Sequence, residues 1–374
     1  MRLGCGVMLL SVLCSAAGAQ TDLAFARAKH LRRGINLSNW YAQTGNNDYY
    51  SPARLASYMT PADFQMIHEL GFDHVRLSIN PEPLLADKAT GSLDVAAMAR
   101  LDGVVQRIVA LGMVIILDIH PEPEWSHDST QTEDGTARFL SFWKSFAGHF
   151  AGTDPEKVYF EVLNEPMRMD VYRWAGEQAK AIAVIRAQAP RHTIIATGAM
   201  WGAIDSLVAT EPVRDDDVIY TFHDYHPMEF THQGVGSVMK ELATLRDVPY
   251  PSSPENVAPL LPGQSDAEVR KSLAWYGQQR WDASMMEKEI GVAAAWAKER
   301  HVPLYCGEFG VIREFAPSAD RARWIGDMRR TLEGYGIGWD MWDYKGWFGM
   351  VREKDGVPFV DEAVAKALGL RGRE

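Results

Sequence analysis

This sequence of 374 residues predicts an α/β fold, a single (β/α)8 TIM barrel with a long loop after its sixth strand. Eight short apolar segments rich in β-branched residues recur along the chain, and segments with a helical spacing of apolar residues separate most of them. Such alternation indicates a parallel sheet with right-handed crossovers, and eight units in one domain favour a closed barrel. A doubly wound sheet is the alternative, but no G-x-G-x-x-G or G-x-x-x-x-G-K-S/T motif follows any of the strands.

The expected strands share runs of β-branched and aromatic residues that stop at a polar residue, a glycine or a proline. The fourth strand begins at Val158, and Asn164-Glu165-Pro166 ends it, because proline has no N–H with which to continue a ladder. The eight expected strands are 33–37, 74–79, 114–119, 158–163, 192–198, 218–222, 302–307 and 337–342.

The expected helices show apolar residues at the spacing of one helix face. The first carries clear end signals: Thr60 as N-cap, Pro61 at the first helical position and Gly71 as the stop. The others are centred on 97–111, 139–150, 171–185, 285–296 and 324–332.

The gap between the sixth and seventh strands holds the long loop, from His226 to about Gln264. It contains six prolines and little periodicity. Loops of this length within a compact domain are usually functional or mobile, so we expect this one to contribute to a binding site.

The first residues predict a secretory signal peptide that is cut after Ala19, which leaves 20–374 as one catalytic domain. Arg2 gives a positive start, 7–12 an apolar centre and 17–19 a small-residue cleavage site. A membrane anchor is the alternative, but the apolar run is too short to span a bilayer. We therefore expect a secreted or periplasmic protein.

The charge balance limits the choice of partners. Lys and Arg number 38 against 49 Asp and Glu, a formal net charge of −11. An acidic surface argues against nucleic acid or anionic lipid, and no later apolar run could span a membrane. We expect a monomer that acts on a neutral substrate. Of the three cysteines only Cys306 would remain after cleavage, so no disulfide is expected within the mature monomer.

Polar and ionisable residues lie at or near the ends of the expected strands. In a (β/α)8 barrel the active site lies at the C-terminal face of the strands, so these side chains should meet there. Two of them, Glu165 and Glu308, are carboxylates, and a pair of carboxylates is what glycosidic cleavage needs: one protonated to donate to the leaving oxygen, the other ionised. The full set is Arg76, His120, Asn164, Glu165, His223, Tyr225, Glu308 and Trp342.

Two motifs and their neighbours resemble glycoside hydrolase family 5, the cellulase-type retaining hydrolases. The motifs are Leu163-Asn164-Glu165-Pro166 and Gly307-Glu308-Phe309-Gly310. The resemblance covers the chain from Gly34 to about Gly349, and Asn-Glu-Pro alone would be a weak signal. The other matches, in chain order, are Arg76, His120, His223-x-Tyr225 and Trp342.

The resemblance implies a double displacement through a glycosyl-enzyme, with Glu165 as the general acid/base and Glu308 as the nucleophile. For that retaining mechanism the two carboxyl groups should lie about 5–5.5 Å apart. Tyr225 and Arg76 would orient Glu308 and keep it ionised, while desolvation would keep Glu165 protonated. No organic cofactor or metal is needed, and no H-x-x-x-H or H-E-x-x-H spacing predicts zinc.

The remaining members of the set receive substrate-binding or supporting roles from the same resemblance. Asn164 would bind the sugar 2-hydroxyl, and Trp342 would form the stacking floor. His120 and His223 would contact the sugar at the cleavage point or support the glutamates. Ordinary structural histidines are the alternative for those two.

Four further tryptophans follow expected strands and could stack on sugar rings. Trp201 and Trp347 are the preferred candidates, followed by Trp40 and Trp125. Aromatic rings also dominate protein cores, so packing is the alternative for each of them.

The function that we expect is hydrolysis of β-linked glucan, most simply as an endo-β-1,4-glucanase. A related β-glycanase acting on mannan, mixed-linkage glucan or β-1,3-glucan is the alternative, because subsite loops decide the polymer. A non-catalytic carbohydrate-binding barrel and a cell-surface scaffold are alternatives from other classes. Neither alternative explains why two carboxylates and other ionisable residues lie at the strand ends, where burying them is costly.

Overall fold

The computed structural model describes residues 23–44, 50–354 and 357–371. The expected signal peptide, with its cleavage point after Ala19 and the residues Cys5 and Cys14, lies outside the described residues. Within the described ranges, no helix combines the length and the apolar character needed to cross a bilayer.

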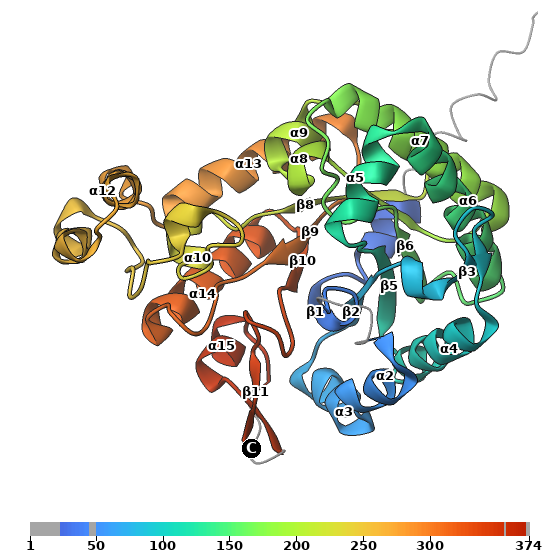
Figure 1. Cartoon of the computed structure of the whole chain (residues 1–374), viewed down its shortest axis with the longest axis horizontal. Helices are drawn as coiled ribbons and strands as arrows, with labels where there is room; N and C mark the ends of the chain where they lie inside the picture. Colours follow the sequence, from blue (N-terminus) through green and yellow to red (C-terminus); the bar gives the residue numbers. More distant parts are fainter. Residues whose placement is uncertain (1–22, 45–49, 355–356, 372–374) are drawn as a thin grey trace, which may run out of the picture.

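Eight parallel strands close into a barrel, as predicted, in the order β1-β10-β9-β8-β7-β6-β5-β2 (Figure 1). Neighbouring strands pair in register, for example His74 with Val114 and Ile79 with Ile119 between β2 and β5. The barrel strands are β1 (Arg33–Tyr41), β2 (His74–Ile79), β5 (Val114–Ile119), β6 (Val158–Glu161), β7 (Ile194–Thr197), β8 (Val218–His223), β9 (Leu304–Phe309) and β10 (Gly338–Met341).

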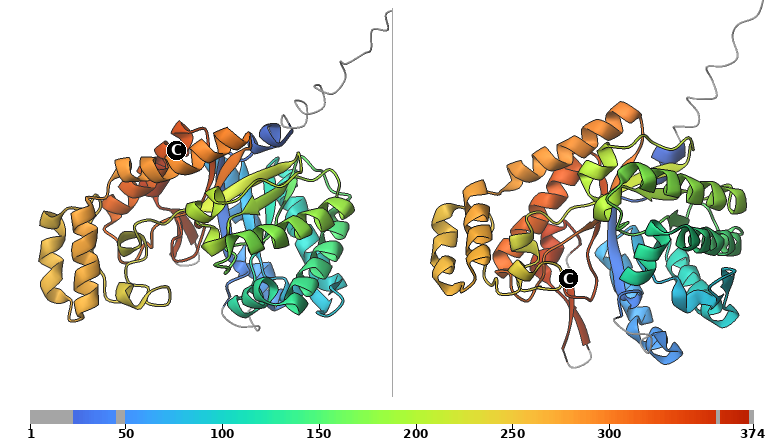
Figure 2. Two further views of the ribbon diagram at one scale, coloured as in Figure 1. Left: turned by 90° about the horizontal axis from the view of Figure 1, so that it is seen from above. Right: turned by 45° about the horizontal axis from the view of Figure 1, so that its top comes forward.

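Helices surround the barrel, and the six predicted from the sequence are all present (Figure 2). The first shows its predicted end signals. The Thr60 side chain accepts from the Asp63 N–H, the Asp63 side chain accepts from the Thr60 N–H, and Gly71 ends the helix with a φ of 92°. The six are α3 (Pro61–Leu70), α4 (Val95–Ala110), α6 (Glu133–Phe150), α7 (Val171–Gln188), α13 (Ala283–Arg300) and α14 (Ser318–Gly334).

Several elements were not predicted, and most lie in the connections. The long loop after β8 contains short helical turns, and it is followed by α12 (Ala267–Gln279), which lies at the edge of the molecule (Figure 1). The short or isolated elements are α2 (Pro52–Tyr58), η2 (Glu82–Leu84), β3 (Leu85–Asp87), β4 (Ser92–Leu93), α5 (Pro123–Gln131), α8 (Ala199–Gly202), α9 (Ile204–Val208), α10 (Met228–Thr231), η3 (Lys240–Leu242), α11 (Pro254–Val257), η4 (Ala258–Gly263), β11 (Val351–Lys354), β12 (Val357–Val360) and α15 (Glu362–Ala367).

The first strand is longer than predicted. The sequence predicts a strand that ends at Leu37, but β1 continues to Tyr41. Its pairing with β2 shifts register between Leu37 and Tyr41, and Asn39 within that stretch has a φ of 53°. The strand is therefore bent at its C-terminal end, which changes where its last side chains point.

Alternate residues of the strands build two cores. Val114 and Ile116 belong to a small cluster with other strand residues, whereas Ile115 and Leu117 belong to the large cluster shared with the helices. This is the period of two that a strand buried on both faces requires. Cys306 lies in the helix-facing cluster.

Trp143 is a fully buried residue of the helix-facing core. Its indole N–H donates to the Val162 carbonyl at 3.0 Å, and its ring contacts those of Phe146 and Phe160. The side chain thus links α6 to the strand that precedes Glu165.

We expect Trp143→Ala to lower the free energy of unfolding by about 3–5 kcal/mol, because it leaves a cavity and an unpaired Val162 carbonyl. Denaturant unfolding monitored by circular dichroism measures this loss. The matched control is Trp275→Ala on α12, whose side chain is 59% exposed and which should change stability by less than about 0.5 kcal/mol. Equal effects of the two variants would contradict the packing role of Trp143.

Candidate active site

The centre of the strand-end cluster is Arg76, a fully buried side chain on β2. Its Nε and Nη2 atoms donate to the two carboxylate oxygens of Glu161 at 2.8 and 2.7 Å. Nη1 donates to Glu308 Oε1 at 2.7 Å and to Asn36 Oδ1 at 2.9 Å. Nη2 also donates to Asn164 Oδ1 at 2.9 Å. One guanidinium on β2 therefore bonds to residues of β1, β6 and β9 and to Asn164, which follows β6.

A third carboxylate, Asp118, lies 3.1 Å from Arg76 Nη2. Burial raises the pKa of Asp118 to about 7, and the guanidinium opposes that shift. Burial also raises the pKa of Glu161. The surrounding carboxylates in turn raise the pKa of Arg76 well above its usual range, against the opposing effect of its own burial. The arginine therefore stays charged, while the carboxyl groups around it hold their protons more readily than in water.

Glu308, on β9, is held at both oxygens. Arg76 donates to one oxygen, and the Tyr225 hydroxyl donates to the other at 2.8 Å. Burial raises the pKa of Glu308, while the positive charge of Arg76 acts to lower it. The two donors that were predicted to hold Glu308 ionised are thus in place, and they work against desolvation.

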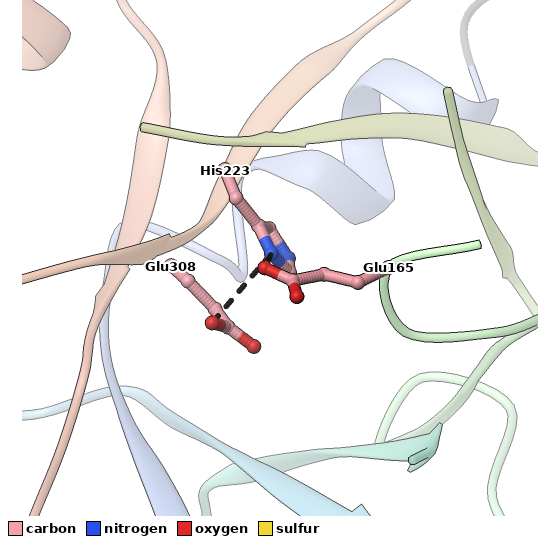
Figure 3. A group of neighbouring side chains, drawn as sticks. All are labelled: Glu165, His223 and Glu308. Atoms are coloured by element: carbon pink, nitrogen blue, oxygen red, sulfur yellow. Dashed lines mark hydrogen bonds and ion pairs between the residues drawn. The ribbon is translucent and has the colours of Figure 1, made fainter. Parts of the chain in front are cut away.

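Glu165 follows β6 and has a φ of 31°, which is unusual for a residue with a side chain. Its side chain is 30% exposed, and its Oε1 lies 2.9 Å from His223 Nδ1. Desolvation raises the pKa of Glu165 to about 7. Figure 3 shows Glu165 and Glu308 entering from opposite sides with His223 beside both.

His223, at the end of β8, bridges the two glutamates. Its Nδ1 lies 3.5 Å from Glu308 Oε2 as well as 2.9 Å from Glu165 Oε1. Burial lowers the pKa of His223 to about 4, so the imidazole is neutral at pH 7 and serves as a hydrogen-bonding partner without a charge.

His120 and Trp342 form a stacked pair of rings next to Asn164. The two rings stack with centroids 5.7 Å apart and planes at 21°. Nδ1 of His120 lies 2.9 Å from Asp118 Oδ2, and Nε2 lies 3.2 Å from the Asn164 amide nitrogen. Burial lowers the pKa of His120 to about 4, so this ring is also neutral at pH 7.

Three residues of this cluster were missed from the sequence: Asn36, Asp118 and Glu161. The signal was present, because each is a polar residue inside an otherwise apolar strand, where burial is costly unless a partner is near. All three are fully buried, and each of them contacts Arg76.

The predicted stacking role of Trp40 is wrong. Its side chain is only 2% exposed, and its indole N–H donates to the Leu55 carbonyl of α2 at 2.8 Å. The bend at the end of β1 turns the ring toward the helices, where it contacts Phe64. Trp125 also packs against other rings, those of Phe139 and Phe142.

Trp201 and Trp347 are exposed, at 49% and 67%. Met200 and Trp201 adopt left-handed conformations, with φ values of 50° and 59°. Such residues cost stability and persist where surrounding contacts fix them, often at functional sites. Here the Trp201 N–H donates to the Pro166 carbonyl at 3.2 Å, which fastens the turn to the residue after Glu165.

Two groups of described residues have the spacing to hold a metal ion: Glu165-His223-Glu308 and Asp224-His226-Glu289. In the second, Glu289 above all raises the pKa of His226 to about 9. That imidazole is therefore protonated at pH 7 and forms ion pairs with both carboxyl groups. A histidine must be neutral to bind a metal ion, so this group does not favour one. In the first, Glu308 already accepts from Arg76 and Tyr225.

A barrel with two facing glutamates at the strand ends is the arrangement of a glycoside hydrolase. A sequence model of Cellulase (glycosyl hydrolase family 5) matches residues 34–346. This chain therefore belongs to glycosyl hydrolase family 5 and is a glycoside hydrolase.

Relatives and solved structures agree with that assignment. Endoglucanase C of Acetivibrio thermocellus is 27% identical over 339 residues, which cover 89% of this chain and 96% of the relative. Cellodextrinase A of Ruminococcus flavefaciens is 27% identical over 323 residues, covering 83% and 84%. The structure of Thermotoga maritima Cel5A in complex with cellobiose has a TM-score of 0.74 and 26% identity, and the match covers 92% of this chain and 99% of that chain.

We expect Arg76→Met to lower the free energy of unfolding by about 3–5 kcal/mol, because it leaves buried carboxylates without their cation. Without the guanidinium these carboxyl groups have folded-state pKa values further above their unfolded values. The folded variant then binds more protons, so its stability falls more steeply than that of the wild type as pH rises from about 5 to 8. Denaturant unfolding at a series of pH values measures both effects.

The control for Arg76→Met is Arg280→Ala. Arg280 forms an exposed ion pair with Glu255 at 3.2 Å, and its loss should cost at most about 1 kcal/mol. A pH dependence for Arg76→Met parallel to that of the wild type would contradict the shared-cation arrangement.

Proposed function

We propose that this protein hydrolyses internal β-1,4 linkages of glucan with retention of configuration. The main support for this proposal is the separation of the two glutamates: one oxygen of Glu165 and one of Glu308 lie within 4.8 Å of each other. That spacing suits a direct attack by one carboxylate, whereas an inverting pair stands about 6.5–9.5 Å apart to admit a water.

In the first step, a Glu308 oxygen attacks the anomeric carbon as the bond from that carbon to the leaving oxygen breaks. Glu165, whose pKa near 7 keeps a large share of it protonated at neutral pH, gives its proton to the leaving oxygen. The product is a glycosyl ester on Glu308 and a freed chain end.

In the second step, Glu165 is a carboxylate and takes a proton from a water molecule that attacks the same carbon. The bond to Glu308 breaks, and its electron pair returns to the carboxylate, which Arg76 and Tyr225 stabilise. Two displacements at one carbon restore its configuration.

The surrounding residues position these groups and the sugar. Asn164 is oriented by Arg76 and His120, and we assign to it the sugar 2-hydroxyl. Trp342 forms the floor against which the reacting sugar stacks. Trp201, tied to the residue after Glu165, offers a face to the departing part of the chain.

β-1,4-Glucan is the preferred substrate because the relatives include endoglucanases. Mannan is a second candidate on a specific observation: Thermotoga maritima Cel5A, at 25% identity and a TM-score of 0.74, has been crystallised with mannotriose. We also propose that 20–374 forms one catalytic domain, exported by the signal peptide and active as a monomer.

We expect Glu165→Gln and Glu308→Gln each to lower hydrolysis of the preferred polymer by on the order of a thousandfold, because each removes one chemical step. Reducing-sugar release from carboxymethylcellulose, barley mixed-linkage glucan, laminarin and mannan measures the effect and selects the polymer. Glu268→Gln, on the exposed face of α12, is the control with unchanged activity.

Full activity of either glutamine variant would contradict the two-carboxylate assignment. Binding of these polymers by the wild type without any release of reducing sugar would favour the non-catalytic carbohydrate-binding barrel.

The pH dependence of kcat/KM should be bell-shaped. Activity should fall as pH rises through about 7, because Glu165 loses the proton that it must donate. On the acid side it should fall as Glu308 becomes protonated, and this limb should lie above the ordinary pKa of a glutamate.

The alkaline limb tests the assignment of Glu165. With a dinitrophenyl glycoside, whose leaving group needs no proton, Glu165→Gln should lose this limb in kcat/KM. An alkaline limb at the same pH in wild type and variant would assign it to another group.

A further inference from the structure

The segment 166–168 follows Glu165 directly, and other parts of the chain hold its backbone carbonyls. The donors are the Trp201 N–H to Pro166 at 3.2 Å, the Met200 N–H to Arg168 at 3.1 Å and the Gln131 side chain to Met167 at 2.7 Å. Glu165 itself has a φ of 31°, a conformation that costs stability and persists where surrounding contacts impose it. The contacts of this segment therefore set the direction in which the Glu165 side chain leaves the backbone.

The side chain of Arg168 connects the segment to two helices. Its Nη1 donates to Gln131 Oε1 on α5 at 2.6 Å, and its Nη2 donates to Glu177 Oε1 on α7 at 3.1 Å. The Gln131 amide thus accepts from the Arg168 side chain through its oxygen and donates to the Met167 carbonyl through its nitrogen. Arg168 and Gln131 together fasten both the side chain and the backbone of the segment.

Arg168 acts on Glu165 through the backbone and not by contact. Among the described residues, its guanidinium donates to Gln131 and Glu177, and the Glu177 carboxylate balances its charge. Arg168 and Glu177 are both buried, at 7% and 6% exposure. Arg168 is therefore placed to support the segment, not to touch the sugar or the reacting atoms.

The carboxyl group of Glu165 is held less firmly than that of Glu308. Both oxygens of Glu308 accept hydrogen bonds, from Arg76 and Tyr225. Among the described residues, the Glu165 carboxyl group has one such partner, His223 at 2.9 Å. The backbone of Glu165 therefore decides where its carboxyl group can reach. A proton donor must come within about 2.6–3.2 Å of the leaving oxygen, and an error of about 1 Å costs up to about a hundredfold in rate.

We propose that Arg168 is a positioning residue for proton transfer by Glu165. Through Gln131 and Glu177 it fixes the segment 166–168 against α5 and α7. The segment in turn aims the Glu165 carboxyl group at the leaving oxygen in the first step and at the attacking water in the second. The proposal rests on the proposed function, because it concerns the proton that Glu165 gives and takes.

The experiment compares two substrates with the same sugars, phenyl and dinitrophenyl β-cellobioside, or the matching glycosides of the sugar that the polymer assay selects. Only the phenyl group needs a proton as it leaves, and kcat/KM reports on this first step. Arg168→Met should lower kcat/KM about 10- to 100-fold for the phenyl glycoside and less than about twofold for the dinitrophenyl glycoside. Glu165→Gln should show the same selectivity with a larger loss.

Two further variants separate positioning from stability. Arg168→Met leaves the buried Glu177 carboxylate without this partner, which destabilises the fold. The double variant Arg168→Met, Glu177→Met removes both charges, so stability should largely return while the defect toward the phenyl glycoside remains. Arg168→Lys keeps the charge but not the planar fork that reaches both partners, so it should restore part of the activity. Where the methionine variants do not fold, Arg168→Lys decides by the same ratio of the two substrates.

The matched control is Arg173→Met. The Arg173 Nε also donates to Glu177 Oε1, at 3.2 Å, but its side chain is 49% exposed and belongs to α7 itself. Its loss should leave kcat/KM for both glycosides unchanged.

A loss confined to the phenyl glycoside, kept in the double variant, supports the proposal. A parallel loss for both glycosides, or no loss for either, overturns it. The same selective loss in Arg173→Met also overturns it, because the effect would then belong to Glu177 and not to the segment. The proposed function fails separately, and this proposal with it, if the wild type cleaves neither glycoside or if Glu165→Gln loses both activities equally.

Discussion

The site depends on the burial of one guanidinium among three carboxylates. Arg76 has no exposed surface, and its bonds to Glu161, Glu308 and Asn164 draw strands from across the barrel to a common point. A buried cation of this kind is expensive unless every donor is used. Only a particular placement of the carboxylates offsets the desolvation of Arg76. The contacts around Arg76 therefore fix the position of Glu308 before any substrate binds.

The barrel could be predicted from the sequence because strands buried on both faces leave a plain signal. Segments such as 114–119 are almost wholly apolar, and Thr60 and Gly71 mark the two ends of helix α3. The hairpin of β11 and β12 and the helix α12 were not predicted. The sequence of β11 is largely polar, β12 has only four residues, and α12 carries several exposed side chains, so no strong apolar period marks them.

The site residues that end a strand could be predicted from the sequence. Residues whose side-chain direction depends on the local backbone geometry could not. The convergence of Glu165, His223 and Glu308 follows from the topology of a parallel barrel alone. The stacking role of Trp40 was wrongly predicted because the direction of its side chain depends on a register shift and on the left-handed conformation of Asn39. Neither feature can be recognised from the pattern of side chains. Glu161 was missed because its partner, Arg76, lies on a strand distant in sequence.

The two glutamates differ in how firmly they are held, and the difference fits their proposed tasks. Glu308 accepts from Arg76 and Tyr225, so both its oxygens are fixed, as a group that must attack along one line requires. Glu165 lies beside a neutral histidine and keeps 30% exposure. A residue that gives a proton to a departing sugar and later takes one from water must reach both, so a rigid clamp on it would slow one of the two steps.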